Sequence, residues 1–275
     1  MKSKMTKIVM AVAALLTAGL MIAGCGGKKE AAKDTAKEKK VLHVAMTATF
    51  PPFEYAEKDG SYAGIDVDIA KYVANKLGMK VEISDMKFAS LIPTLQSGRA
   101  DMVISGISPT DKRSEVVSFT DSYFYPPKAI VAKKGTNFTD LNALKGHSAG
   151  ATMGTTYVKD LKAVDGIKVV ELDSATMAVQ DVLNGRLDAT LCDGTHAIVF
   201  CKEHPELEMH MMKLSTGKDD TFAIAFPKNS PNVAKVNKIL EDMKKNGDFH
   251  KILVKHLGEE QTKKYESMVK EMGLK

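Results

Sequence analysis

Residues 102–113 read MVISGISPTDKR and combine a short apolar run with residue types that bind a small anion. The apolar run predicts a buried strand that ends at Ser105, Gly106 and Ser108. Gly106 has no side chain, so a ligand can approach its backbone closely. Arg113 offers a planar guanidinium that matches a carboxylate. Because ligands of open α/β sheets bind beyond the carboxyl ends of strands, this stretch predicts an anion site in a cleft.

The second half of the chain repeats this plan. Residues 98–101 read GRAD before the first strand, and residues 185–188 read GRLD before another predicted strand. In this register, Gly106 corresponds to Asp193. Both residues follow the carboxyl end of a predicted strand, so two facing lobes would direct them into one cleft.

Strands and helices alternate on both sides of the middle of the chain, which predicts an α/β fold. The first half has predicted strands at 41–47, 81–84 and 102–105, and helices capped by Asp66 and Ser90. The second half has predicted strands at 147–152, 169–172 and 189–192, and helices at 157–164 and after Ser174. A last strand at 222–226 and helices at 231–247 and 249–257 complete the chain, with 259–275 as an added charged helix or a frayed tail.

Several motifs in order resemble those of one family. They are TFPPFEY at 49–55, GIDVDIA at 64–70, the segment 88–95, the loop after residue 104, and FTD at 119–121. Over about 41–257, the chain resembles the periplasmic amino-acid-binding proteins, solute-binding family 3 of ABC importers. The resemblance implies a two-lobe periplasmic-binding-protein-like fold with a ligand cleft between lobes joined by two crossover strands.

The resemblance also implies where the chain passes between lobes. The first crossing is expected at YPP, residues 125–127, and the return near 219–222. The predicted first lobe therefore takes residues 41–125 and 220–275, and the predicted second lobe takes residues 126–219.

A free amino acid carries a carboxylate and an ammonium on one carbon, and each charge needs a partner when it is desolvated. The resemblance gives Arg113 to the carboxylate, together with Ser108, Thr155 and Thr156. It gives Asp193 to the ammonium, with contacts from Ser105 and Gly106, and it makes Phe50 and Phe88 the walls around the ligand side chain. Phe53 is expected in the core.

Each of these residues also has a structural explanation. Arg113 could instead be a solvated arginine paired with Asp111 or Glu115. Thr155, Thr156 and Asp193 could simply cap helices. Phenylalanines pack in cores far more often than they bind ligands.

The side-chain end of the expected cleft departs from some relatives. Thr47 stands where binders of basic side chains, and the glutamine binder, have an aspartate. Thr152, Met153 and Cys192 are expected at the same end and are uncharged, unlike the lysine and histidine of the glutamine binder at the positions of Thr152 and Cys192. These differences predict a polar or neutral ligand of modest size.

The N-terminus has the pattern of a lipoprotein signal peptide at residues 1–24. Lys2, Lys4 and Lys7 precede an apolar run, and residues 22–25 read IAGC, which resembles a bacterial lipobox. The resemblance makes Cys25 the lipidated first residue, followed by a charged flexible linker over residues 25–40. An uncleaved anchor helix is the alternative. From the signal peptide and the lipidation we expect the protein in the cell envelope, outside the cytoplasm and lipid-anchored to the membrane.

Loss of residues 1–24 lowers the formal net charge from +5 to +2, which gives no reason to expect nucleic-acid binding. No cysteine or histidine spacing suggests a metal, no cofactor is expected, and Cys192 and Cys201 are expected as free thiols. The expected partners are a free amino acid and a permease, and the expected state is a monomer. A binding protein is predicted rather than an enzyme. A cyclohexadienyl-dehydratase-like enzyme on the same fold is the main alternative, and a sensory or peptidoglycan-enzyme module is a third class.

Overall fold

The computed structural model describes residues 40–215 and 217–274. The predicted signal peptide at 1–24, the predicted lipidation residue Cys25 and nearly all of the predicted linker lie outside the described residues. Within the described part of the chain, no helix is long and apolar enough to cross a membrane. The same residues contain no cluster of histidine, cysteine, aspartate and glutamate able to hold a metal ion.

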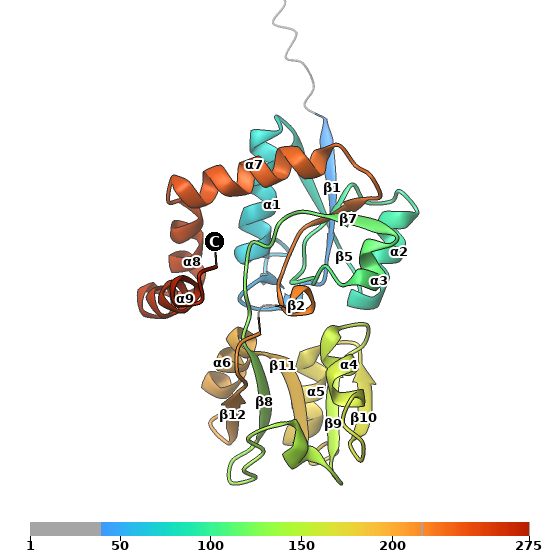
Figure 1. The fold of residues 1–275 in the computed structure, drawn as a ribbon, viewed down its shortest axis with the longest axis vertical. Helices are drawn as coiled ribbons and strands as arrows, with labels where there is room; N and C mark the ends of the chain where they lie inside the picture. The colour runs from blue at the N-terminus through green and yellow to red at the C-terminus, as the bar shows by residue number, and fades with distance from the viewer. Residues whose placement is uncertain (1–39, 216, 275) are drawn as a thin grey trace, which may run out of the picture. The chain divides into compact units, whose positions relative to one another are not determined.

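A mixed sheet forms the centre of the first lobe (Figure 1). Its strands are β1 (Val41–Met46), β5 (Lys80–Asp85), β6 (Met102–Val103), β7 (Val117–Phe119) and β13 (Ala225–Pro227). Their order across the sheet is β5-β1-β6-β13-β7. Strand β1 is parallel to β5 and β6, whereas β13 is antiparallel to β6 and β7. Because β13 lies more than a hundred residues after β7, the chain leaves this lobe and later returns to it.

Helices cover both faces of this sheet, so its strands alternate between two cores. The helices are α1 (Ile65–Lys76), α2 (Leu91–Gln96), α3 (Asp111–Ser114), α7 (Asn232–Lys245), α8 (Asp248–Leu257) and α9 (Glu259–Glu271), and a 3-10 turn, η1 (Phe88–Ser90), precedes α2. Val44 and Met46 of β1 pack in the core with α1, α7 and α8, and Ala45 between them packs in the core with α2. This period of two is what a strand buried on both faces requires.

The second lobe repeats the arrangement of the first. Its strands are β8 (Lys128–Lys133), β9 (Ser148–Thr152), β10 (Lys168–Leu172), β11 (Ala189–Asp193) and β12 (Leu207–Met211), in the order β10-β9-β11-β8-β12. Its helical elements are η2 (Leu141–Leu144), α4 (Thr156–Lys162), α5 (Ala175–Leu183) and α6 (Gly194–Glu203). In each lobe three parallel strands are followed across the sheet by antiparallel ones.

The repeated Gly-Arg-x-Asp segments have the same role in both lobes. The carboxylate of Asp101 accepts a hydrogen bond from the backbone N–H of His43 at 2.9 Å. The carboxylate of Asp188 accepts one from the backbone N–H of Ser148 at 2.7 Å. Each aspartate therefore ties the start of a central strand to its parallel neighbour, which explains why the sequence repeats there.

Two segments connect the lobes, and they meet at an antiparallel bridge between Phe124 and Phe222 (Figure 1). A 3-10 turn, η3 (Lys218–Asp220), precedes the return. The regular strand that follows covers only residues 225–227, so the predicted strand at 222–226 is wrong at its start. Phe222 is occupied by the bridge instead. The domain boundaries after residues 125 and 219 stay predictions.

A small antiparallel sheet carries part of the site. It consists of β2 (Thr49–Phe50), β3 (Glu54–Ala56) and β4 (Tyr62–Ala63). Phe50 on β2 lies opposite Glu54 on β3. The hairpin therefore places an aromatic wall and a carboxyl group side by side at the edge of the first lobe.

Two predicted helix caps are wrong. Asp66 does not cap α1, because the N–H groups of Ile65 and Asp66 donate to the carbonyls of Pro52 and Phe53 at 3.0 and 2.9 Å. Ser90 stands at the start of α2, but its hydroxyl makes no capping bond there. At α1, carbonyl groups distant in sequence take over the role that a side chain usually has at a helix start.

Candidate functional site

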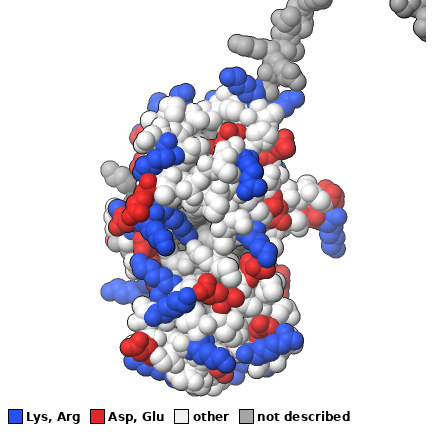
Figure 2. All heavy atoms as spheres, turned by 90° about the vertical axis from the view of Figure 1, so that its right-hand side faces the viewer, with Lys and Arg blue, Asp and Glu red and all other residues white. Residues whose placement is uncertain are grey.

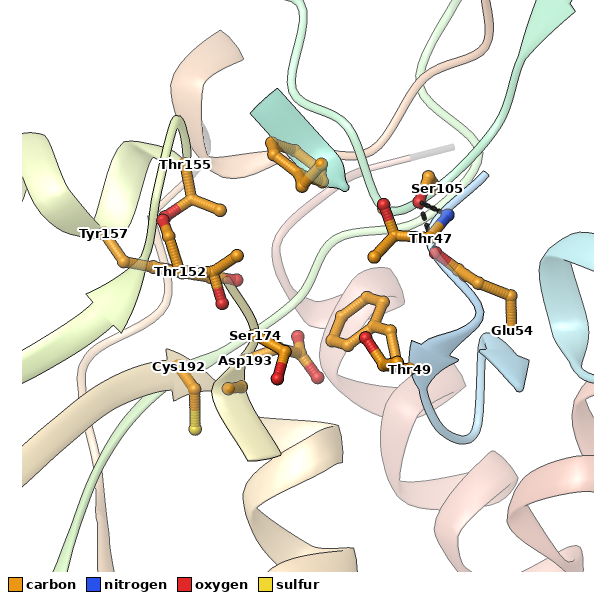
Figure 3. Close-up of a pocket in the computed structure, with 14 residues that line it drawn as sticks. Thr47, Thr49, Glu54, Ser105, Thr152, Thr155, Tyr157, Ser174, Cys192 and Asp193 are labelled. Atoms are coloured by element: carbon orange, nitrogen blue, oxygen red, sulfur yellow. Dashed lines mark hydrogen bonds between the residues drawn. The ribbon is translucent and has the colours of Figure 1, made fainter. Parts of the chain in front are cut away.

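A pocket lies where the strand ends of the two lobes face each other (Figure 3). The space between its lining residues, including the part open to solvent, is about 480 Å³. Six predicted site residues line it: Phe50, Phe88, Ser105, Gly106, Thr155 and Asp193. Arg113 and Thr156 line a second cavity that shares Phe88 and Thr155 with the first, so the two cavities adjoin. Ser108 is buried beside them and lines neither.

Arg113 connects the two lobes through backbone carbonyls. Its guanidinium donates to the carbonyl of Ser108 at 2.7 Å in the first lobe and to that of Gly154 at 2.9 Å in the second. It also lies over the ring of Phe88, 5.5 Å from the ring centre. Burial lowers the pKa of Arg113 to about 10, which leaves it charged at neutral pH.

The alternative explanation for Arg113 is wrong as far as Asp111 is concerned. Asp111 pairs with Lys218 at 2.8 Å instead. The guanidinium is thus held near the pocket by neutral carbonyls and an aromatic ring, which leaves its positive charge without a carboxylate in direct contact among the described residues. A ligand carboxylate would supply one.

Thr155 stands at the start of α4 but does not cap it. Its hydroxyl donates to the carbonyl of Thr152 at 2.6 Å, and no side-chain capping bond forms. Thr156 is the first residue of the helix and is largely buried. The capping explanation therefore fails for Thr155, and its contact with a ligand stays a prediction.

Asp193 is fully buried at the end of β11 and the start of α6. Its Oδ1 accepts a hydrogen bond from the backbone N–H of His196 at 2.8 Å, so it does cap the helix. Its Oδ2 is buried and has no hydrogen-bond partner among the described residues. Burial raises the pKa of Asp193 to about 7. One oxygen thus has a structural role, and the other is suited to accept from an ammonium.

Phe50 is a wall of the pocket that reaches both lobes. It stacks on the buried Phe53, with ring centres 4.8 Å apart, and its edge contacts the ring of His196 in the second lobe at 5.1 Å. Phe53 is a core residue, as predicted. His196 is buried, and burial lowers its pKa to about 3, so it is neutral and supplies packing rather than charge.

Glu54 is the main site residue that sequence reasoning missed. It is fully buried, lines the pocket and accepts a hydrogen bond from the hydroxyl of Ser105 at 2.5 Å (Figure 3). Burial first, and then the charge of Asp66, raise its pKa well above the usual range. A signal was present, since Glu54 is the one charged residue in the TFPPFEY motif.

A sequence profile of the bacterial extracellular solute-binding proteins, family 3, matches residues 42–259. The chain belongs to this family. The family resemblance and the two-lobe α/β fold predicted from the sequence are therefore confirmed. Membership places the chain among extracytoplasmic solute-binding proteins.

Relatives within family 3 bind amino acids. The arginine-binding extracellular protein ArtP of Bacillus subtilis is 33% identical, over 89% of this chain and 95% of the relative. A probable histidine-binding protein of Neisseria gonorrhoeae is 30% identical, over 90% of this chain and 95% of the relative. The solved structure of an ancestral arginine-binding protein bound to arginine has a TM-score of 0.76 and 39% identity, covering 80% of this chain and 99% of that one.

Among the residues that line the pocket of this family 3 protein are five with a hydroxyl or thiol group: Thr47, Thr49, Thr152, Ser174 and Cys192. Met153, which was expected there, is 43% exposed and does not line the pocket, so that prediction is wrong. The turn after β9 points its side chain to solvent. Cys192 and Cys201 are free thiols, as predicted.

The surface of this family 3 protein carries mixed charge. On the face in Figure 2, Lys and Arg side chains alternate with Asp and Glu. Ion pairs in the described residues join the lobes directly, among them Lys87 with Asp173 at 2.7 Å and Lys218 with Asp111 at 2.8 Å. The side chains of both pairs are substantially exposed, so they contribute little to stability.

Proposed function

We propose that this protein captures a free L-amino acid outside the cytoplasm and delivers it to the permease of an ABC transporter. The main observation in support is that each lobe provides one of two groups of opposite charge. Arg113, from the first lobe, lies beside the pocket with its guanidinium bonded to neutral carbonyls, and Asp193, from the second, lines the pocket with an unpaired oxygen. Together they match the two charges of an amino-acid zwitterion.

Closure of the lobes is the proposed mechanism. A ligand that touches Arg113 and Asp193 has contacts with both lobes, so it stabilises the arrangement in which they face each other. The antiparallel bridge between Phe124 and Phe222 ties the two connecting segments together, which suits them to bend as a unit. The permease would then recognise the closed form.

The proposed ligand has a polar side chain. The hydroxyl and thiol groups that line the pocket support this, and so does the spread of ligands among relatives. Their names give arginine, histidine and cystine, and the ancestral protein was also solved with glutamine. What these ligands share is a polar side chain, and the names do not indicate one particular amino acid. The replacement of an aspartate by Thr47 predicts a neutral side chain.

Calorimetry on single variants tests the clamp formed by Arg113 and Asp193. Removing one partner of a buried charge pair costs on the order of 3–5 kcal/mol, because the other charge is stranded. Arg113→Ala and Asp193→Ala should each lower affinity by a few hundredfold or more, at about tenfold per 1.4 kcal/mol. The ligand is first identified by mass spectrometry of the compound released from denatured protein. Folded variants that bind it within about tenfold of the parent would refute the clamp.

Attachment to the membrane through lipid on Cys25 is part of the proposal, as is a monomeric state. The lipobox at residues 22–25 supports the first. Cys25→Ser should yield either an uncleaved precursor or protein released from membranes on cell fractionation. A mature, membrane-bound Cys25→Ser protein would count against it.

A dehydratase-like enzyme is the second candidate, and Glu54 is the observation in its favour. A carboxyl group in a pocket, with a pKa that burial raises well above its usual range, is suited to general acid catalysis. The relatives point instead to binding proteins of transporters. Incubation with prephenate or arogenate separates the two candidates, because only an enzyme would turn these compounds over.

A further inference from the structure

The turn η3 (Lys218–Asp220) in the return segment consists of three charged residues, and each forms an ion pair with a different partner. Asp220 binds the ammonium of Lys128, at the start of β8 in the second lobe. Asp160 on α4 binds the same ammonium at 2.6 Å. The three side chains are at most 26% exposed, so solvent screens these contacts less than it screens surface pairs. This cluster fixes η3 to the second lobe.

The other two residues of η3 connect α4 in the second lobe with α3 in the first. Asp219 pairs with Lys159 on α4 at 2.6 Å. Lys218 pairs with Asp111, the first residue of α3, at 2.8 Å. The pKa of Asp111 is lowered first by Lys218 and then also by the charge of Lys159. Four charges of alternating sign therefore span the lobes, and they act as a network rather than as isolated surface pairs.

The two helices that η3 connects are those expected to hold the ligand carboxylate. Helix α3 carries Arg113, and α4 starts directly after Thr155. Asp219 lines the same cavity as both of these residues. Its charge also acts on Arg113, where it opposes the lowering of the pKa by burial. Because Asp219 is paired with Lys159, the guanidinium remains available to a ligand carboxylate.

We propose that Lys218 is a positioning residue for ligand binding: held to the second lobe through Asp219 and Asp220, it fixes α3, and with it Arg113, against α4 when the lobes close. This inference rests on the proposed function. None of the three residues of η3 lines the ligand pocket. Lys218 therefore stabilises the closed lobes equally for every amino acid that binds, and its loss should be seen mainly as faster release.

A charge swap between Lys218 and Asp111 tests this contact with the first lobe. Calorimetry on the full mature protein with each of the common L-amino acids first identifies those that bind. In 10 mM salt, Lys218→Asp and Asp111→Lys should each weaken these ligands by about three- to tenfold, by the same factor for every ligand. The double variant Lys218→Asp/Asp111→Lys should recover most of the affinity. Stopped-flow measurements should show the losses as faster dissociation.

The matched control is Lys213→Asp. Lys213 is an exposed lysine five residues before Lys218 and has no ion pair among the described residues, so the variant makes the same change in net charge without breaking a pair. Its affinities should equal those of the parent. Ligand-free Lys218→Asp should match the parent in urea denaturation, because an exposed pair contributes little to the stability of the fold.

Ionic strength gives a measurement that needs no variant. The screening length falls from about 30 Å in 10 mM salt to about 3 Å in 1 M salt. Release of the ligand from the parent should therefore be faster in 1 M salt, and the difference between the parent and Lys218→Asp should shrink to less than about twofold. A dissociation rate of the parent that does not change with salt would overturn the inference.

The other outcomes separate the inference from the proposed function. If Lys218→Asp binds as tightly as the parent, or Lys213→Asp is weakened as much, the inference fails, while amino-acid binding by the parent still supports the proposed function. A loss that differs between ligands, or that the double variant does not recover, also refutes it. So does a ligand-free Lys218→Asp of lowered stability, because the pair would then support the fold rather than closure. If the parent binds no α-amino acid, the proposed function fails as well.

Discussion

At the scale of single residues, Gly106 shows how the site depends on the absence of a side chain. Its φ of +51° lies in the left-handed region, and a Cβ built on it would lie 2.6 Å from Cε1 of Phe50. Residue 106 therefore cannot carry a side chain while the ring of Phe50 keeps its position at the pocket.

We predict that Gly106→Ala lowers both stability and ligand affinity. Left-handed backbone costs a residue with a Cβ roughly 1–2 kcal/mol, and overpacking against Phe50 adds roughly 1–3 kcal/mol. Gly78→Ala is the control, because its φ is +70° and nothing lies within 4 Å of its added Cβ. In urea denaturation, Gly78→Ala should lose only the roughly 1–2 kcal/mol of stability that left-handed backbone costs. Equal losses in both variants would show that the contact with Phe50 does not matter.

Asp193 gives the ligand-free protein a pH-dependent stability. Its pKa of about 7 is raised from an ordinary 3.8, so between these values the folded state holds a proton that the unfolded state has lost. Stability from this group is complete below pH 4 and is lost as pH rises through 7. Asp193→Asn should therefore lose less stability between pH 5 and pH 8 than the parent, by on the order of 2–4 kcal/mol in urea denaturation. Parallel pH profiles would contradict this.

The site residues predicted from the sequence came from the family resemblance, and two of them also stand where their position in the chain implies a role. Asp193 ends an apolar strand, where a carboxyl needs a partner, and Arg113 follows a small-residue loop. Glu54 was missed because nothing local indicates that this end of a short hairpin strand is buried. Asp66 was misread for a similar reason. A carboxyl at a helix start normally caps it, but here carbonyls distant in sequence satisfy the helix, and the carboxyl turns inward to Tyr123.

At the scale of elements, helix α9 lies almost entirely outside the part of the chain that matches the family profile. The family profile ends at residue 259, where α9 begins. Its Tyr265 stacks on Phe124 with ring centres 4.2 Å apart and an angle of 5°. The Tyr265 hydroxyl accepts from the backbone N–H of Tyr125 at 3.1 Å. The expected added helix, rather than a frayed tail, is thus present and braces a connecting segment.

We predict that Tyr265→Ala destabilises the protein, by less than the roughly 3–5 kcal/mol typical of a fully buried aromatic residue, because Tyr265 is only partly buried. Tyr265→Phe keeps the stacking and loses one hydrogen bond, worth about 1 kcal/mol. Thermal denaturation of the two variants separates packing from hydrogen bonding. Hydrogen exchange at residues 123–125 should rise in Tyr265→Ala and change little in Tyr265→Phe. Unchanged exchange in both variants would remove the bracing role of α9.

At the scale of the whole two-lobe unit, the prediction is compaction on ligand binding. The ligand would add contacts between lobes that are also joined by two connecting segments, by the Arg113–Gly154 bond and by exposed ion pairs such as Lys87–Asp173 and Lys218–Asp111. Small-angle scattering should show a smaller radius of gyration at saturating ligand, and Asp193→Ala should show no change at the same concentration. A parent protein with an unchanged radius at saturation would contradict lobe closure.

The two backbone bonds of Arg113 have a kinetic consequence. The guanidinium that is proposed to hold the ligand carboxylate also joins Ser108 to Gly154 across the cleft. Escape of the amino acid and separation of the lobes would then share one rate-limiting event. Ligands of different affinity should accordingly differ in residence time more than in association rate, as related complexes usually do. A permease that pulls the lobes apart would shorten that residence time directly, without competing for the ligand.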